Sequence, residues 1–132
     1  MDHSTNGIAL GIDGWIYIAV GDFGFVDATD REGTQLTLWN GGIVRVRPDG
    51  TEMEIYTTGM RNIYDVAIDP YLNIFTIGNT NDGGGWWVRV THHIQYGYYG
   101  YPRHYQNFTE EIIPALQAFG PGSGSGAWYL DE

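Results

Sequence analysis

The sequence contains no cysteine, which excludes a disulfide framework and a thiolate metal site. Cationic side chains are scarce, because six Lys plus Arg stand against sixteen Asp plus Glu, and the formal net charge is −10. So few cations cannot build a basic stripe for phosphate backbones, so we expect no nucleic-acid partner. No apolar run approaches the roughly 20 residues of a membrane-spanning helix, and no signal peptide opens the chain, so we expect no membrane insertion.

Two common catalytic motifs are also missing. There is no Gly-x-Ser-x-Gly elbow and no phosphate-binding glycine loop followed by lysine, so nothing supports a serine hydrolase or a nucleotide site. What the chain has instead is twenty glycines and 15% aromatic residues. This pairing is typical of short strands joined by tight turns, where glycine adopts positive φ and aromatic side chains cover the faces of sheets.

The clearest positive signal is an internal repeat. The segments 6–13 and 17–22 recur as 62–69 and 74–79, each an apolar strand followed by an Asp-containing turn and a second apolar strand ending in Gly-Asp or Gly-Asn. Such a period is typical of β-propellers and β-solenoids. We therefore predict an all-β fold of antiparallel, propeller-like blades, an incomplete propeller of about two to three blades. One partial domain covers 1–132, with repeat units near 6–61 and 62–118 and the start of a further blade at 127–132.

Turn chemistry places the individual strands. Asp-Gly, Pro-Asp-Gly and Asp-Pro turns predict three hairpins, which pair 7–10 with 15–20, 42–47 with 52–57, and 63–68 with 74–77. Further strands are expected at 86–91 and 127–130, and a tight aromatic turn at 97–102. Polar, glycine-containing stretches predict loops at 21–35, 79–85 and 120–126. The only helical turn is expected within 110–118, where Pro114 argues against a long helix.

Several polar and aromatic residues allow more than one interpretation. Acidic or amide side chains gather in two loops, and each loop is either a calcium site or, by default, a solvated loop (Asp22, Asp27, Asp30 and Glu32; Asn79, Asn81 and Asp82). His92 and His93 point to opposite faces of a strand and cannot share one metal ion. An aromatic group packs between blades or binds sugar rings (Trp86, Trp87, Tyr96, Tyr98, Tyr99 and Tyr101).

Five motifs occur in an order that resembles a known family. They are the first hairpin after His3, Gly21-Asp-Phe-Gly24, Gly42-Ile-Val-Arg-Val-Arg-Pro-Asp-Gly50, Gly59-Met-Arg-Asn62 and Gly97-Tyr-Tyr-Gly-Tyr-Pro102. The series resembles the soluble quinoprotein glucose dehydrogenases, also called PQQ-dependent aldose sugar dehydrogenases, and is closer still to related bacterial propeller domains named after membrane-bound dehydrogenases. The resemblance covers about residues 2–103.

The resemblance implies a cofactor, a metal and a reaction. The family oxidises sugars by hydride transfer from an alcohol carbon to PQQ, with calcium beside the cofactor, on a six-bladed propeller. By resemblance His3 is the catalytic base, and Arg61 and Asn62 bind the cofactor. The backbone carbonyls of Gly78, Asn79 and Thr80 fall where the family binds calcium.

Two departures from the family pattern lie next to these residues. Ile63-Tyr64 stands where the sugar dehydrogenases have Pro-Gln, and the stretch 78–82 replaces a Gln-Gly-Pro run. Read without the resemblance, a histidine as near the N-terminus as His3 is expected to be frayed. Asn62, which aligns with Asn6 in the repeat, is equally well explained as a residue that caps a turn.

The expectations for partners follow from the same observations. An open propeller leaves sheet edges and apolar faces uncovered, so we expect a homo-oligomer or part of a larger propeller. The substrate is expected to be a sugar or another alcohol, and the resemblance suggests the periplasm or the extracellular space. The alternatives are a non-catalytic propeller module that binds carbohydrate or protein, and a purely structural, self-assembling propeller portion.

Overall fold

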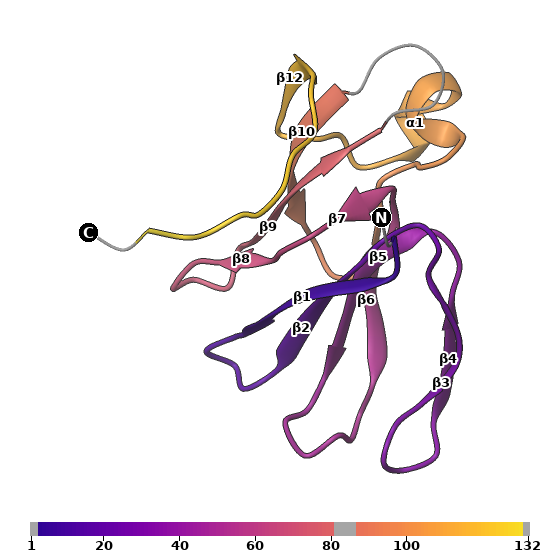
Figure 1. The fold of residues 1–132 in the computed structure, drawn as a ribbon, viewed down its shortest axis with the longest axis vertical. Helices are drawn as coiled ribbons and strands as arrows, with labels where there is room; N and C mark the ends of the chain where they lie inside the picture. The colour runs from indigo at the N-terminus through magenta and orange to yellow at the C-terminus, as the bar shows by residue number, and fades with distance from the viewer. Residues whose placement is uncertain (1–2, 81–86, 131–132) are drawn as a thin grey trace.

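The computed structural model describes residues 3–80 and 87–130, and these residues form an almost entirely β structure (Figure 1). The all-β fold predicted from the repeat is confirmed. The strands are β1 Thr5–Leu10, β2 Ile16–Val20, β3 Phe25–Thr29, β4 Gln35–Leu38, β5 Gly41–Val46, β6 Glu54–Met60, β7 Asn62–Ile63, β8 Ala67–Ile68, β9 Ile74–Asn79, β10 Trp87–His93, β11 Gly97–Tyr98 and β12 Gln117–Pro121. The helices are α1 His104–Asn107 and the 3-10 turn η1 Thr109–Glu111.

The first sheet has the strand order β1-β2-β5-β6-β11. Its first four strands pair antiparallel, as the two predicted hairpins require, with Ile18 opposite Ile8 on one side and Val44 on the other. The outer strand β11 comes from much later in the chain and pairs parallel with β6, Gly97 opposite Thr57. The second half of the chain is therefore attached to the edge of the first sheet.

The second sheet has the order β12-β10-β9-β7, and β8 also pairs with β9. The strand predicted at 63–68 is divided into β7 and β8. The strand β9 forms at the position predicted for its hairpin partner, 74–77. Each copy of the sequence repeat lies in its own sheet. Within the described residues neither sheet closes on itself, because each ends in edge strands.

The segment 21–35 was expected to be a loop, and this expectation is wrong. It contains β3, which pairs with β4 as a two-stranded ribbon (Figure 1), and Leu38 of this ribbon packs against Val20 and Val44 of the first sheet. The two strands have only five and four residues, and Leu38 is the only buried residue among them, so sequence reasoning has only a short pattern of apolar and polar residues to detect. Its turn is built by Asp30, whose carboxylate accepts hydrogen bonds from the backbone N–H groups of Glu32 (2.9 Å) and Thr34 (2.8 Å).

Two expectations for the C-terminal part are also wrong. The helical turn expected within 110–118 is found only at its start, where η1 ends at Glu111, and the end of that segment becomes β12 on the edge of β10. Open backbone groups on β10 explain this outcome, because Leu116 N–H already donates to Val90 O at 2.9 Å. The strand expected at 127–130 is not formed, and these residues run as unpaired, extended chain.

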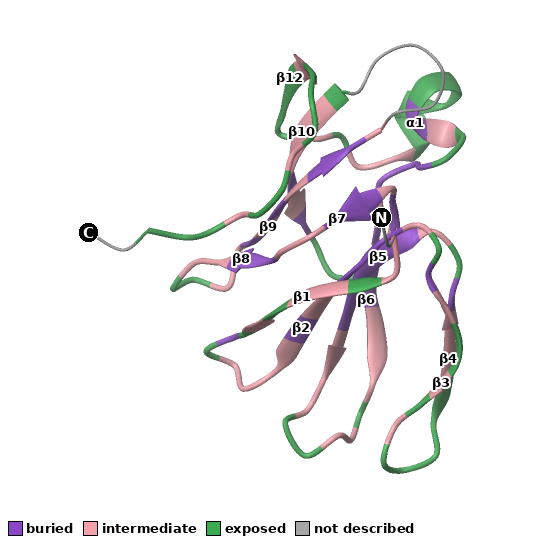
Figure 2. Ribbon diagram, viewed as in Figure 1, coloured by how far each residue is buried: buried purple, intermediate pink, exposed green. Residues whose placement is uncertain are grey.

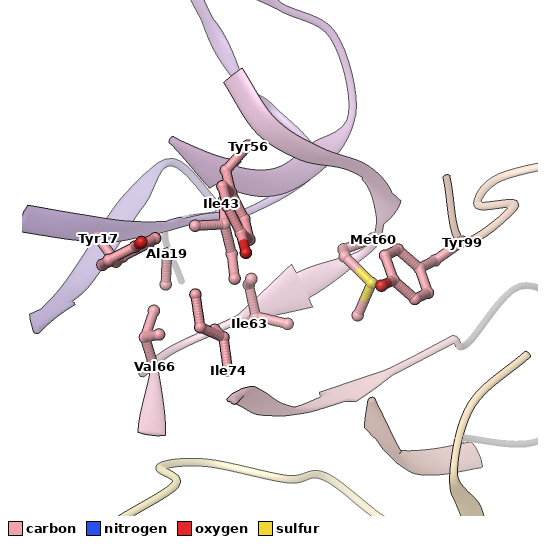
Figure 3. Close-up of a cluster of buried hydrophobic side chains, with 9 residues drawn as sticks. All are labelled: Tyr17, Ala19, Ile43, Tyr56, Met60, Ile63, Val66, Ile74 and Tyr99. Carbon is pink, nitrogen blue, oxygen red and sulfur yellow. The ribbon is translucent and has the colours of Figure 1, made fainter. Parts of the chain in front are cut away.

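The main core lies where the two sheets meet, and Figure 2 shows buried residues concentrated there. Figure 3 shows side chains of β2 and β5 (Tyr17, Ala19 and Ile43) facing Ile63 and Ile74 of the second sheet. A buried polar contact crosses the same boundary, because His93 on β10 is hydrogen-bonded to Thr57 on β6 (Nδ1, 3.0 Å) and Thr76 on β9 (Nε2, 2.7 Å). The sheets are therefore one packed unit. No helix in the described parts of the chain is long and apolar enough to span a membrane.

Candidate functional site

His3 is held in place by side chains from both halves of the chain. Its Nδ1 lies 2.5 Å from Asp22 Oδ1, and Tyr101 Oη donates to the other carboxylate oxygen of Asp22 at 3.0 Å. A carboxylate accepts hydrogen bonds but cannot donate one, so Nδ1 carries the proton and Nε2 keeps its lone pair. In the neutral imidazole, this arrangement leaves on Nε2 the lone pair that a general base needs.

The backbone around His3 is tied to the same loop. His3 O accepts from Phe23 N–H at 3.1 Å, Ser4 O accepts from Gly21 N–H at 2.7 Å, and the His3 and Phe23 rings lie 5.2 Å apart. The imidazole side chain retains only 14% of its exposure. The alternative of a frayed terminal histidine is therefore not what the structure shows.

Asn62 lies next to this segment but is engaged in the fold. Asn6 Nδ2 donates to Asn62 Oδ1 at 3.2 Å and to Ile63 O at 2.8 Å, which links the two copies of the repeat. Asn62 is buried, and a Cβ added at Gly21 would lie within 2.6 Å of both its Oδ1 and His3 O. Its position favours the structural interpretation, while keeping it adjacent to the His3 backbone.

Arg61 points towards the end of β9. Its Nη1 donates to Asn79 Oδ1 at 2.8 Å, and the two residues line a pocket of roughly 330 Å³ together with Gly78 and Thr80. The structure therefore gathers four of the six predicted site residues in one pocket, and places His3 and Asn62 outside its lining.

The proposed calcium ligands have an unfavourable geometry. Gly78 and Asn79 lie inside β9, which is paired on one side with β10 and on the other with β7, so their carbonyls are directed along the sheet ladder. Thr80 N–H donates to Trp87 O at 3.1 Å. In the described parts of the chain no three His, Cys, Asp or Glu side chains gather as a metal site. Asn81 and Asp82, which the sequence also suggested, lie outside the described residues.

Sequence reasoning missed Arg89 in this pocket. It lies on β10, and its guanidinium is 5.3 Å from the centroid of the buried Tyr105 ring. The signal available in the sequence was the presence of a rare cation within an apolar strand, Trp87-Val-Arg-Val-Thr91. Nothing in the sequence placed that strand beside Arg61.

The remaining candidates are explained by packing. His93 is fully buried while His92 stacks on Phe75, so the two rings lie on opposite faces as predicted. Burial, together with a smaller contribution from the neighbouring His92, lowers the pKa of His93 to about 3. Among the aromatic group, Tyr99 and Tyr101 are buried, Trp87 and Tyr96 are exposed, and Trp86 lies outside the described residues.

Comparison with known proteins gives one family and one fold. A family described as a domain of unknown function, DUF7133, matches residues 1–117. No curated protein matches the sequence. Among solved structures, the PQQ-bound aldose sugar dehydrogenase from Streptomyces coelicolor resembles this chain with a TM-score of 0.70 at 24% identity. The match covers 95% of this chain and 39% of that one, so the chain spans about two fifths of its structural neighbour, and the likeness shows the propeller-type fold.

Proposed function

The chain belongs to the DUF7133 family, and we propose that it is part of a PQQ-dependent sugar or alcohol dehydrogenase-like propeller. The observation that carries the proposal is the His3–Asp22 pair, in which a carboxylate fixes an imidazole with its Nε2 available as a base. A fold similar to a PQQ-bound sugar dehydrogenase supports the same reading.

The donor set at Arg61 suits the cofactor. PQQ carries carboxylates and quinone oxygens, and a guanidinium donates to such oxygens through a planar fork. Arg61 and Arg89 both line the pocket at this end of the molecule, and none of its described lining residues is an acid. When bound, PQQ would accept the hydride from the alcohol carbon.

Each residue around His3 has a role in that reaction. His3 Nε2 takes the proton of the substrate hydroxyl, and Asp22 stabilises the imidazolium that results. Tyr101 donates to Asp22 Oδ2 and so keeps the carboxylate turned towards His3. The exposed ring of Phe23, which contacts His3, offers an apolar wall to one face of a sugar ring.

The proposed function assigns no role to calcium. The carbonyls of Gly78 and Asn79 lie in the paired strand β9, and the residues present do not fit a calcium site. We propose that the rest of the cofactor site comes from further blades, supplied by a larger propeller or by other copies of this chain. On the same grounds we propose a periplasmic or extracellular location.

The test is a calorimetric titration of the 132-residue chain with PQQ, on a sample whose mass is fixed by light scattering and whose folding is checked by its melting curve. We expect saturable binding that Arg61→Gln weakens, while Arg103→Gln, at an exposed position outside the pocket, leaves it unchanged. Equal binding by Arg61→Gln, or absence of PQQ binding to a folded sample whose mass is that of a closed ring, would overturn the proposal.

A further inference from the structure

The pocket beside Arg61 has a composition of its own. It lies between the end of β6, the strands β9 and β10, and the segment 105–118, and His3 and Asp22 do not line it. Its volume of roughly 330 Å³ is at the lower end of the range of ligand pockets. We propose that this pocket binds a small organic acid, whose carboxylate contacts Arg89 and Arg61 and whose carbon skeleton packs on the apolar wall.

The charges of the chain point to an anion here. All six cationic side chains are arginines, and two of them line this one pocket of a protein whose net charge is −10. Two others, Arg45 and Arg47, form ion pairs with glutamates. The described lining contains no Asp or Glu, and the nearest acids in sequence, on η1, are exposed outside it. An anion that enters therefore meets the guanidinium of Arg89, and none of the described lining residues is a carboxylate.

Arg89 is positioned by the fold. Its strand is paired on both sides, opposite Gly78 of β9 and Ala118 of β12. The guanidinium lies near the ring of Tyr105, which is itself buried and stacks on Tyr101 with centroids 6.0 Å apart. No described carboxylate forms an ion pair with Arg89. Contact with the aromatic ring orients the guanidinium, and its N–H groups remain able to donate hydrogen bonds to a carboxylate.

The apolar part of the pocket lining, which we call the apolar wall, is fixed to the strands by backbone hydrogen bonds. Ile112, Ile113 and Leu116 line it together with the buried Met60. Ile113 N–H donates to Tyr98 O at 2.9 Å, and Leu116 N–H donates to Val90 O at 2.9 Å, so the segment is fixed to the strands beneath it. Apolar lining favours a ligand with a carbon skeleton, whereas a bare inorganic anion gains nothing from it.

This inference does not rest on the dehydrogenase assignment, because binding of a small acid here requires neither PQQ nor the His3–Asp22 pair, although a small acid and PQQ would compete for the same arginines, Arg61 and Arg89. Its test is therefore a titration of the 132-residue chain in low salt, without PQQ and without calcium. Benzoate serves as the probe, benzamide as its neutral isostere, and inorganic phosphate as the anion without an apolar body. Calorimetry and ligand-observed NMR measure the binding.

We expect benzoate to bind, with benzamide and phosphate each weaker by about tenfold or more. Arg89→Gln should weaken benzoate binding by about tenfold or more, and Arg103→Gln should not change it. If Arg89→Gln fails to fold, benzoate-induced shifts of the Arg89 Nε–H and Tyr105 ring signals in the wild-type chain decide instead. Equal binding of benzamide or phosphate, equal binding by Arg89→Gln, or shifts elsewhere in the molecule would overturn the inference.

Discussion

The ends of β2 and β9 occupy equivalent places in the repeat but carry different chemistry. Gly21-Asp22 follows the first strand and Gly78-Asn79 closes the second, 57 residues later. Asp22 holds His3 through its carboxylate, whereas Asn79 accepts a hydrogen bond from Arg61 through its amide oxygen. A carboxylate stabilises a positive imidazolium, while an amide orients a guanidinium without neutralising it. Under the proposed function, this one position of the repeat supports a base in the first copy and an anion-binding cation in the second.

The largest effect is expected from making the first position resemble the second. Asp22→Asn keeps the shape of the side chain but removes the charge that stabilises the imidazolium and fixes its tautomer. PQQ-dependent dye reduction should fall by about 100-fold or more, with PQQ affinity retained. Steady-state kinetics measures the first quantity and calorimetry the second. Turnover within a few-fold of wild type would contradict the role given to this pair.

The reverse exchange should act on binding. Asn79→Asp places a carboxylate 2.8 Å from Arg61 Nη1 if the geometry is kept, where it neutralises the guanidinium and repels an anionic ligand. PQQ affinity should fall by about tenfold or more. The matched control is Asn107→Asp at an exposed position on α1, which makes the same change of charge away from the pocket. An equal loss in the control would mean that net charge alone is responsible.

The boundary between the two copies should be sensitive to acid. Because His93 is buried and its pKa is about 3 in the folded chain against 6.5 in the unfolded chain, the unfolded chain binds more protons between these values. The contribution of the neutral, buried His93 to stability is present above about pH 6.5 and decreases as the pH falls towards 3. Urea unfolding of wild type and His93→Gln across this range measures the effect, with His92→Gln as the control. Equal pH slopes in wild type and His93→Gln would refute it.

The smallest effect concerns the asparagine pair that joins the repeats. Asn6→Ala removes donors to Asn62 Oδ1 and Ile63 O, and should lower the free energy of unfolding by about 1–2 kcal/mol. Asn107→Ala, on the exposed face of α1, should change it by less than about 0.5 kcal/mol. Chemical denaturation compares the two. A loss no greater than that of the control would show that the cross-link is not stabilising.

The repeat and its turn residues were enough to predict the strands that have one apolar face. The hairpins β1–β2 and β5–β6 follow directly from Asp13-Gly14 and Pro48-Asp49-Gly50. The ribbon β3–β4 was missed because its strands are short and only Leu38 among them is buried, and β12 because edge pairing with β10 depends on a partner distant in sequence. Local patterns report burial and turns, but not which open edge a polar segment will join.

The candidate site likewise has features that local patterns predict and features that depend on distant partners. Family motifs pointed to His3 and Arg61, but the partners that orient them come from other elements. Tyr101 is hydrogen-bonded to Asp22 although the two residues are 79 positions apart in the sequence. Arg89 lines the same pocket as Arg61 because β10 pairs with β9. Such contacts depend on how the two sheets pack, which no local pattern contains.

The most direct test of the central claim compares PQQ titrations of wild type, Asp22→Asn and Asn79→Asp under one set of conditions. If the two equivalent positions divide base and cofactor functions between them, wild type and Asp22→Asn bind PQQ alike, and Asn79→Asp binds it about tenfold or more weakly. Equal binding by all three, or a loss in Asp22→Asn as large as that in Asn79→Asp, would contradict the account.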